Sequence, residues 1–341
     1  MNISDVLAKL MRRENLSVDE ASDAMSAIMS GTATPAQISA LLVGLTMKGE
    51  RPAEIVGLAR TMRANAVQLT KPCADVFDTC GTGGDRSGTF NISSAAALVA
   101  AAAGLRVAKH GNRSVSSQCG SADVYEALGV NVAADPAVVE RSLATVGIAF
   151  FFAPTFHPSM RHAAPVRREL GVRTTFNLLG PLTNPAGTQS QLVGVPHSEL
   201  TELLARALLL LGSTRAWVVH GADGIDEMST TGHTKVSECR NGAVSTFWVH
   251  PSDFGIPKAE PRDLRGGDAA TNAGILRDVI AGQQGPRRNV VLLNAGAALF
   301  IGGKTSSVRA GIERAAEAID SGAARTILDA MIAASHETRP E

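Results

Sequence analysis

The stretch DTCGTGGD at residues 78–85 follows directly after a short β-rich run. Its three glycines in four positions let the backbone turn sharply and point N–H groups at an anion with no Cβ in the way. It is not the dinucleotide-binding fingerprint, because Arg86 stands where glycine or alanine is needed, and it lacks the Gly-Lys-Ser/Thr end of a Walker A loop. The stretch therefore predicts either a structural turn or a site for phosphate or diphosphate at the end of a strand.

Outward from this loop, β-rich runs alternate with helical ones. The β-rich runs cover residues 74–79, 105–109, 148–152, 191–195 and 215–220, and the helical stretches lie near 92–103, 121–128, 136–146 and 198–211. Such alternation predicts an α/β domain with a largely parallel sheet. Ligands in such folds bind at the carboxyl ends of strands, so the loops after Thr79, Lys109 and His220 are expected to carry the chemistry. A hairpin over 234–249 and four helical stretches from about 269 follow.

The first 70 residues are predicted to be all helical. Ser17 with Glu20 forms a capping-box pattern, and Thr34 with Gln37 forms a second one. Apolar residues recur at helical spacing in the second of these helices, at Ile38, Leu41, Leu42 and Leu45. We expect part of this stripe to pack against another subunit.

Composition limits the classes of function. A chain of 341 residues, 45% of them hydrophobic, can bury a large core and exceeds the usual size of one domain, so two domains are expected. Lys+Arg and Asp+Glu are equal at 32 each, which argues against nucleic-acid and membrane-surface partners. Four scattered cysteines, no basic stub before an apolar segment and no long apolar stretch predict a reduced, cytoplasmic protein.

TFNISS at residues 89–94 opens the alanine-rich helical stretch. Small hydroxyl and amide side chains at a helix N-terminus, with free N–H groups behind them, form an anion site. Plain N-capping explains the same residues. With the glycine loop beside it, the two interpretations are about even.

A polar segment follows the predicted strand at 105–109: KHGNRSVSS at residues 109–117, and then QCGSAD at 118–123. It carries two cations, a histidine, an amide and several hydroxyls with almost no apolar residue. Packing does not explain such a composition, so the segment favours ligand binding.

Two further segments are less decisive. GADGIDE at residues 221–227 places adjacent carboxylates on a glycine-rich loop, which suits Mg²⁺ but also describes a polar turn. In FHPSMRHAAPVRRE at 156–169, helical geometry puts Arg161 and Arg168 near one face and Arg167 on another, so a single arginine can be directed into a cleft. Without further context, solvated surface arginines are the favoured interpretation.

Taken together and in this order, the motifs resemble the anthranilate phosphoribosyltransferase family along essentially the whole chain. The segments that carry the resemblance are 78–85, 89–94, 109–124, 156–171, FNLLGPLTNPA at 176–186, 221–227 and LRGGDAATNA at 264–273. The resemblance implies a Mg²⁺-dependent enzyme of tryptophan biosynthesis. It would transfer the phosphoribosyl group of phosphoribosyl pyrophosphate (PRPP) to the anthranilate amine, giving N-(5-phosphoribosyl)anthranilate and pyrophosphate.

The resemblance also implies the architecture. A small helical domain of residues 1–71 and about 168–188 would join two subunits into a homodimer. An α/β domain of residues 72–167 and 189–341 would bind PRPP, with the active site in the cleft between the domains. Two Mg²⁺ ions per subunit are expected.

Site residues follow position by position from the family's motifs. Those implied for PRPP are Gly81, Gly84, Asp85, Thr89, Asn91, Ile92, Ser93, Ser94, Lys109, His110, Gly111, Asn112, Arg113, Ser114, Val115, Ser116, Ser117 and Ser121. Those implied for anthranilate are Gly81, Asn112 and Arg167, with Arg167 pairing with its carboxylate, and those implied for the metals are Ser93, Asp226 and Glu227.

Departure of pyrophosphate requires neutralised charge, which metal ions and backbone N–H groups supply without proton transfer. The anthranilate amine is neutral at working pH, so no general base is assigned, although His110 is a candidate. Two alternatives stay open. One is a pyrimidine nucleoside phosphorylase, which shares the fold and a glycine loop. The other is a family relative that has lost this activity and binds nucleic acid.

Overall fold

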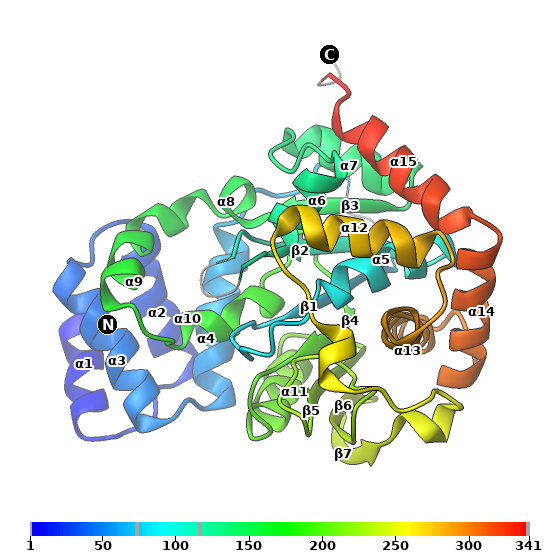
Figure 1. Ribbon diagram of the computed structural model, residues 1–341. Coiled ribbons are helices and arrows are strands. Elements are labelled where there is room, and N and C mark those ends of the chain that lie inside the picture. Colours follow the sequence, from blue (N-terminus) through cyan, green and yellow to red (C-terminus); the bar gives the residue numbers. More distant parts are fainter. Residues whose placement is uncertain (1, 72–74, 115–117, 339–341) are drawn as a thin grey trace.

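The computed structural model describes residues 2–71, 75–114 and 118–338. Its N-terminal part is a bundle of four helices, drawn in blue in Figure 1: α1 (Ile3–Met11), α2 (Val18–Met29), α3 (Pro35–Lys48) and α4 (Pro52–Ala64). Both predicted capping boxes are confirmed. The hydroxyls of Ser17 and Thr34 accept from the N–H groups of Glu20 and Gln37, and the N–H groups of Ser17 and Thr34 donate to the side chains of Glu20 and Gln37.

The stripe on α3 does not face another subunit. Ile38, Leu41, Leu42 and Leu45 are buried within the bundle of the chain itself, so that prediction is wrong. A helix that covers several neighbours buries more than one face, and the spacing alone does not say which neighbour covers it.

The described residues of the second part form one seven-stranded sheet in the order β3-β2-β1-β4-β5-β6-β7. Its strands are β1 (Val76–Gly81), β2 (Arg106–Gly111), β3 (Ile148–Phe152), β4 (Ser190–Gly194), β5 (Arg215–Gly221), β6 (Thr234–Arg240) and β7 (Ala243–Val249). The first five are parallel, whereas β6 and β7 are antiparallel and joined by the predicted hairpin turn. The predicted α/β class is confirmed. β1 and β2 each continue two residues further than predicted, into Gly81 and Gly111.

Helices cover both faces of this sheet (Figure 1). Apart from those between β3 and β4, the described helices of this part are α5 (Ile92–Ala102), α6 (Ser121–Leu128), α7 (Pro136–Thr145), α11 (Leu200–Leu210), α12 (Ala269–Ile280), α13 (Pro286–Ile301), α14 (Val308–Asp320) and α15 (Ala323–Ser335), with 3₁₀ helices η3 (Pro251–Phe254) and η4 (Pro261–Leu264) between β7 and α12. Alternate strand residues enter different cores: Trp217 packs with the α5 and α13 side, and Val218 with the α11 side. This two-sided burial explains the nearly continuous apolar strands.

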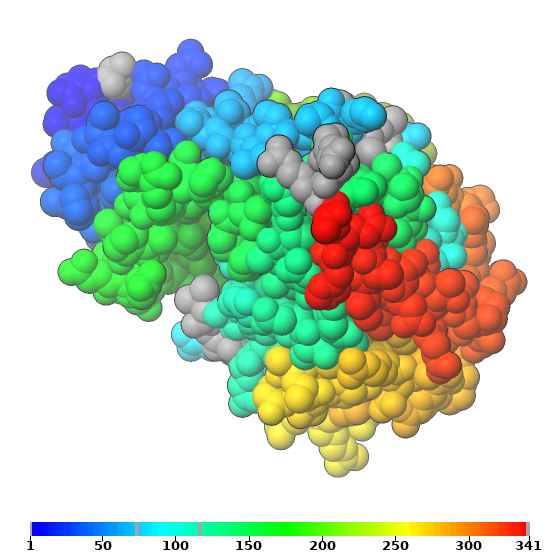
Figure 2. Space-filling model, turned by 90° about the horizontal axis from the view of Figure 1, so that it is seen from above, coloured from blue at the N-terminus to red at the C-terminus, as the bar shows by residue number. Residues whose placement is uncertain are grey.

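A segment between β3 and β4 lies beside the helical bundle. It contains α8 (Ala153–Phe156), η1 (Pro158–His162), α9 (Ala164–Leu170), α10 (Phe176–Leu179) and η2 (Gly180–Leu182). α9 contacts α3 and α10 contacts α4, and Val166 and Leu179 belong to the same apolar core as the bundle. In Figure 2 this green segment and the blue bundle form one side of the molecule, and the red C-terminal helices lie on the other. Among the described residues, no helix is long and apolar enough to cross a membrane.

Candidate active site

Three loops meet at the carboxyl ends of strands in the parallel part of the sheet: residues 82–91 after β1, the described residues 112–114 and 118–120 after β2, and residues 222–233 after β5. The loop after β5 crosses the end of β4, where a Cβ on Gly194 would lie 1.5 Å from the backbone oxygen of Asp226. A Cβ on Gly81 would lie 2.7 Å from Oδ2 of Asp226. Glycine at both positions therefore allows the acidic loop to lie against the glycine loop.

The acidic side chains occupy the backbone donors that the sequence predicted for an anion. The Gly83 N–H donates to Oδ2 of Asp226 at 3.0 Å, and the Ser93 N–H, in the first turn of α5, donates to Oε1 of Glu227 at 3.1 Å. Both donors thus bind carboxyl oxygens in this structure, although these come from the chain itself. This is the behaviour expected of a glycine turn and a helix N-terminus.

Three carboxylates gather here, because the Asp226 N–H also donates to Oδ2 of Asp85 at 3.4 Å. The pKa values of Asp226 and Glu227 are raised, first by burial and then by the negative charge of neighbouring carboxylates. Lys109 opposes the shift at Glu227, but it is itself buried and donates to the backbone oxygen of Thr79. An added cation would relieve this concentration of negative charge.

The donor set fits Mg²⁺. Within residues 2–71, 75–114 and 118–338, no group of three or more His, Cys, Asp or Glu side chains is arranged to hold a metal by itself. Mg²⁺ needs no such cage, since it binds through one or two carboxylates and takes its remaining ligands from water and substrate phosphates. Asp226, Glu227 and the hydroxyl of Ser93 supply oxygen ligands of this kind.

The start of α5 is held by contacts other than a cap. Asn91 makes no capping bond; its side chain accepts from Asn272 at 2.9 Å and donates to the Cys119 oxygen at 3.3 Å. The alternative of plain N-capping is therefore not supported. The side chains of Ile92 and Ser94 are buried. Ile92 could therefore contact a ligand only through its backbone.

The motif at 264–273 contacts the end of the loop after β1. Thr89 pairs with Arg265 in an isolated β-bridge, the Gly266 N–H donates to the Gly88 oxygen at 2.9 Å, and a Cβ on Gly266 would lie 2.8 Å from the Phe90 nitrogen. The motif therefore positions the end of the loop after β1 through backbone contacts.

Arg113 does not point at the other loops but pairs with α6. Its guanidinium contacts Asp123 at 3.0 Å and Glu126 at 2.7 Å. Asp123 also accepts from the N–H groups of Ser114 (3.1 Å) and Gly120 (2.8 Å), so one carboxylate joins both ends of the loop. Val115, Ser116 and Ser117 lie outside the described residues.

At the start of that loop, Gly111 lies against Ser121, whose Oγ would be 2.1 Å from a Cβ at that position. Ser121 donates to the Asn112 oxygen at 3.4 Å, and the Asn112 side chain is exposed.

His110 is a buried, neutral imidazole. Its Nδ1 lies 3.2 Å from the Gly180 oxygen, and its ring centre lies 5.3 Å from that of His157. Burial lowers the pKa of His110 to about 3 and that of His157 to about 4. The Nε2 atoms of both rings are buried and find no hydrogen-bond partner in the described part of the chain. An imidazole with so low a pKa is a weak base.

Of the three arginines within residues 156–169, Arg167 alone is turned inward. It is half-buried over the ring of Phe176, 5.2 Å from the ring centre, and burial lowers its pKa. Arg161 and Arg168 are exposed. One arginine of residues 156–169 is therefore directed inward, which helical geometry allowed but the residues alone did not favour.

Two residues beside the loops were not assigned to the site from the sequence. Arg173, after α9, reaches the glycine loop and donates to the Thr82 oxygen at 3.3 Å. Asn184 donates to the buried Asp78 on β1 at 2.8 Å. Arg173 lies between two of the motifs, and Asn184 lies within the motif at 176–186, which indicated no role for it. Both contacts join residues more than 90 positions apart in the chain.

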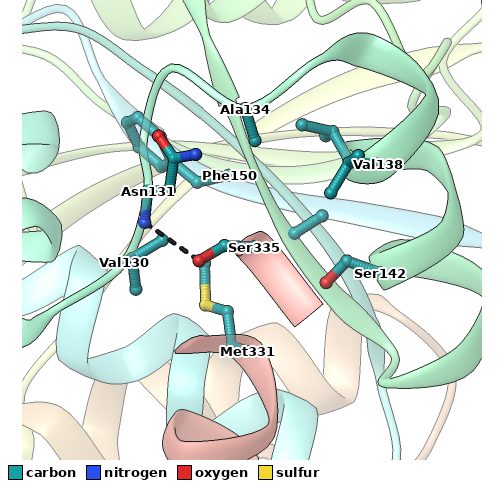
Figure 3. A pocket seen from close by; sticks show the side chains of 10 residues that line it. Val130, Asn131, Ala134, Val138, Ser142, Phe150, Met331 and Ser335 are labelled. Carbon is teal, nitrogen blue, oxygen red and sulfur yellow. Dashed lines mark hydrogen bonds between the residues drawn. The ribbon is translucent and has the colours of Figure 1, made fainter. Parts of the chain in front are cut away.

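A small cavity of about 10 Å³ lies elsewhere, between β3, α7 and α15 (Figure 3). Its lining is mainly apolar, and the Asn131 N–H donates to Oγ of Ser335 at 2.9 Å beside it. The volume is about that of a single water molecule. The cavity shares no residue with the three loops.

Comparison with known proteins identifies the family. Residues 4–66 match the helical bundle domain of a glycosyl transferase family, and residues 73–325 match its a/b domain. The anthranilate phosphoribosyltransferase of Acetivibrio thermocellus is 52% identical over 330 residues, covering 97% of this chain and 96% of its own. That of Rhodospirillum rubrum is 53% identical, covering 97% and 95%. The chain belongs to the anthranilate phosphoribosyltransferase family.

Solved anthranilate phosphoribosyltransferases share the whole fold. The Thermus thermophilus structure superposes with a TM-score of 0.93 at 43% identity, covering 98% of this chain and all of its own. A Saccharomyces cerevisiae structure in complex with PRPP and Mg has a TM-score of 0.89 at 28% identity, covering 98% and 97%. Another from that yeast, in complex with 4-fluoroanthranilate, has a TM-score of 0.85 at 27% identity, covering 98% of both chains.

Proposed function

We propose that the protein transfers the phosphoribosyl group of PRPP to the amine of anthranilate and releases pyrophosphate. The observation that carries this proposal is the meeting of two backbone anion sites, at Gly83 and Ser93, with the carboxylates of Asp226 and Glu227. Donors for phosphate and ligands for a divalent cation in one place are what a magnesium diphosphate requires. The yeast relative in complex with PRPP and Mg has the same fold.

Two Mg²⁺ ions would be held through Ser93, Asp226 and Glu227. When bound, such ions neutralise the negative charge that develops on a departing diphosphate. The carboxylates must leave the N–H groups of Gly83 and Ser93, at least in part, for these donors to reach PRPP. Metal and PRPP are therefore expected to bind more tightly together than apart.

PRPP would lie between the glycine loop and the segment 109–121. Gly81, Gly84 and Asp85 would contact it on one side, with Thr89, Asn91 and the first turn of α5 nearby. Among the described residues after β2, Lys109 to Ser114 and Ser121 would contact it on the other side. Asn112 and Arg167, with Gly81, would hold anthranilate. A half-buried guanidinium without a carboxylate of the described chain within 4.0 Å suits the carboxylate of that substrate.

No general base is proposed. The low pKa of His110 means that its imidazole takes up a proton only weakly near neutral pH. The anthranilate amine is already neutral, so attack on C1 of the ribose depends on its position and on the departure of pyrophosphate. His110 would then line the site as an uncharged group.

The subunit arrangement is part of the proposal. Residues 1–71 and about 168–188 would form the small domain and the remainder the PRPP-binding domain, with the active site between them. Contacts of α9 with α3 and of α10 with α4 support this division. A homodimer would form through α1 and α3, which expose Met11 (86%) and Met47 (70%) beside Val43.

The test is the loss of anthranilate fluorescence when the purified protein is mixed with PRPP and Mg²⁺. We expect consumption that requires both PRPP and the metal. A folded protein that leaves anthranilate unchanged, and instead cleaves thymidine or uridine with phosphate, would be a nucleoside phosphorylase. Salt-sensitive binding of single-stranded DNA without either activity would indicate the nucleic-acid-binding relative.

A further inference from the structure

We propose that Arg173 is a substrate-binding residue that contacts the diphosphate group of PRPP at the glycine loop. The inference rests on the proposed function and adds a residue that no motif indicated. Arg173 lies in the turn between α9 and α10, on the segment that also carries Arg167.

Close approach to the glycine loop is the first observation. A Cβ on Gly84 would lie 1.7 Å from Nη1 and 2.5 Å from Cζ of Arg173, so the guanidinium lies directly on the backbone of that residue. Gly84 has a φ of +83°, which also favours glycine. The arginine can reach this part of the loop only because residue 84 has no side chain.

The guanidinium is incompletely paired. Its only hydrogen bond within the described residues is from Nη2 to the Thr82 oxygen at 3.3 Å, and no carboxylate oxygen of those residues lies within 4.0 Å of it. A guanidinium has five N–H donors in a planar fork that matches phosphate. Most of these donors are therefore available to a ligand.

The charges around Arg173 show what kind of ligand fits. Burial lowers its pKa, and the negative charges of Asp226 and Asp85 oppose this shift, so the three groups share one electrostatic environment. Once a divalent cation binds the carboxylates, their attraction for the arginine is reduced. An anion bound to that cation then becomes the natural partner of Arg173, and diphosphate is the substrate group that meets this description.

Arg167 and Arg173 lie six positions apart but have different surroundings. Arg167 lies over Phe176 and is proposed for the anthranilate carboxylate, whereas Arg173 faces Gly84. One short segment would thus contact both substrates through different arginines. Substitutions at the two positions should therefore affect different substrates.

The test compares Arg173→Gln with Arg168→Gln, an exposed arginine of the same segment. Calorimetry without anthranilate measures binding of PRPP, pyrophosphate and ribose 5-phosphate, each with Mg²⁺. We expect Arg173→Gln to weaken the binding of PRPP and of pyrophosphate by about 10-fold or more, and to leave the binding of ribose 5-phosphate unchanged. Arg168→Gln should bind all three as the unchanged protein does.

Steady-state kinetics give a second readout. Arg173→Gln should raise the KM for PRPP and leave that for anthranilate, and Arg167→Gln should do the reverse. If Arg173→Gln does not fold, Arg173→Lys replaces it, with pyrophosphate binding weakened about threefold or more because an ammonium lacks the planar fork. Equal loss of pyrophosphate and ribose 5-phosphate, or no loss of either, would overturn the inference. Failure of the unchanged protein to bind PRPP would instead overturn the proposed function.

Discussion

The two sides of the candidate site differ in whether their charged side chains are paired within the chain. On the acidic side, Asp85, Asp226 and Glu227 face one another, and the pKa values of the last two are raised. On the basic side, after β2, Arg113 is paired with Asp123 and Glu126. The acidic side therefore needs a ligand to balance its charge, whereas the basic side has balanced its own and fixes the shape of a loop.

Removing the acidic side should have the largest effect. Asp226→Asn with Glu227→Gln keeps the size of both side chains but removes the charge, so Mg²⁺-dependent turnover should fall by about a thousandfold or more. The anthranilate fluorescence assay, run over a range of Mg²⁺ concentrations, measures this. Glu199→Gln, at the exposed start of α11, is the control. A double variant with normal turnover would place the metal elsewhere.

Displacing the acidic side without removing its charge should have the next largest effect. In Gly194→Ala the new Cβ collides with the backbone oxygen of Asp226, so the loop after β5 must shift. We expect kcat/KM to fall by about 10- to 100-fold, since a misplacement near 1 Å is costly for catalysis. Gly274→Ala on α12 is the matched control, because its Cβ would meet nothing within 4 Å. Equal activity of both variants would show that the loop position does not matter.

Substitutions on the basic side should have smaller effects on activity, because they change the shape of the loop after β2. Asp123→Asn weakens the contact that joins the N–H groups of Ser114 and Gly120. The KM for PRPP should rise by about tenfold, with that for anthranilate nearly unchanged. Glu126→Gln removes only an exposed partner of Arg113 and should change either constant less than about twofold. If Glu126→Gln has the larger effect, charge and not loop shape is what this side provides.

The smallest effect near neutral pH concerns the buried histidines. Their folded-state pKa values, about 3 for His110 and about 4 for His157, lie below the ordinary value of 6.5. As pH falls below 6.5 the unfolded chain takes up protons that the folded chain does not, so stability decreases as pH is lowered through this window. The expected loss is about 1.4 kcal/mol per histidine for each pH unit once well below 6.5.

Chemical denaturation between pH 7.5 and 4.5 measures this loss, and His157→Gln should reduce its slope. Activity between pH 6 and 8 should show no ionisation from His110. If kcat of the unchanged protein depends on pH in this range and the dependence disappears in His110→Gln, His110 acts as a general acid or base.

Local chemistry explains why so much of the fold was predictable. The capping boxes at Ser17 and Thr34, the strand at 148–152 and the hairpin over 234–249 depend on residues close in sequence, and each was found where it was expected. The α3 stripe was interpreted wrongly because an amphipathic pattern reveals an apolar face and not its neighbour.

The sequence by itself determined the family, the alternation that makes a mostly parallel sheet, and the glycine and acidic loops at strand ends. Only the tertiary structure decided that Asp226 and Glu227 occupy the N–H groups of Gly83 and Ser93, that Arg113 turns to α6, and that Arg173 lies on Gly84. Motifs record residues that are neighbours along the chain. These contacts join strand ends and loops from separate parts of it, and so they exist only once the sheet has set the order of its strands.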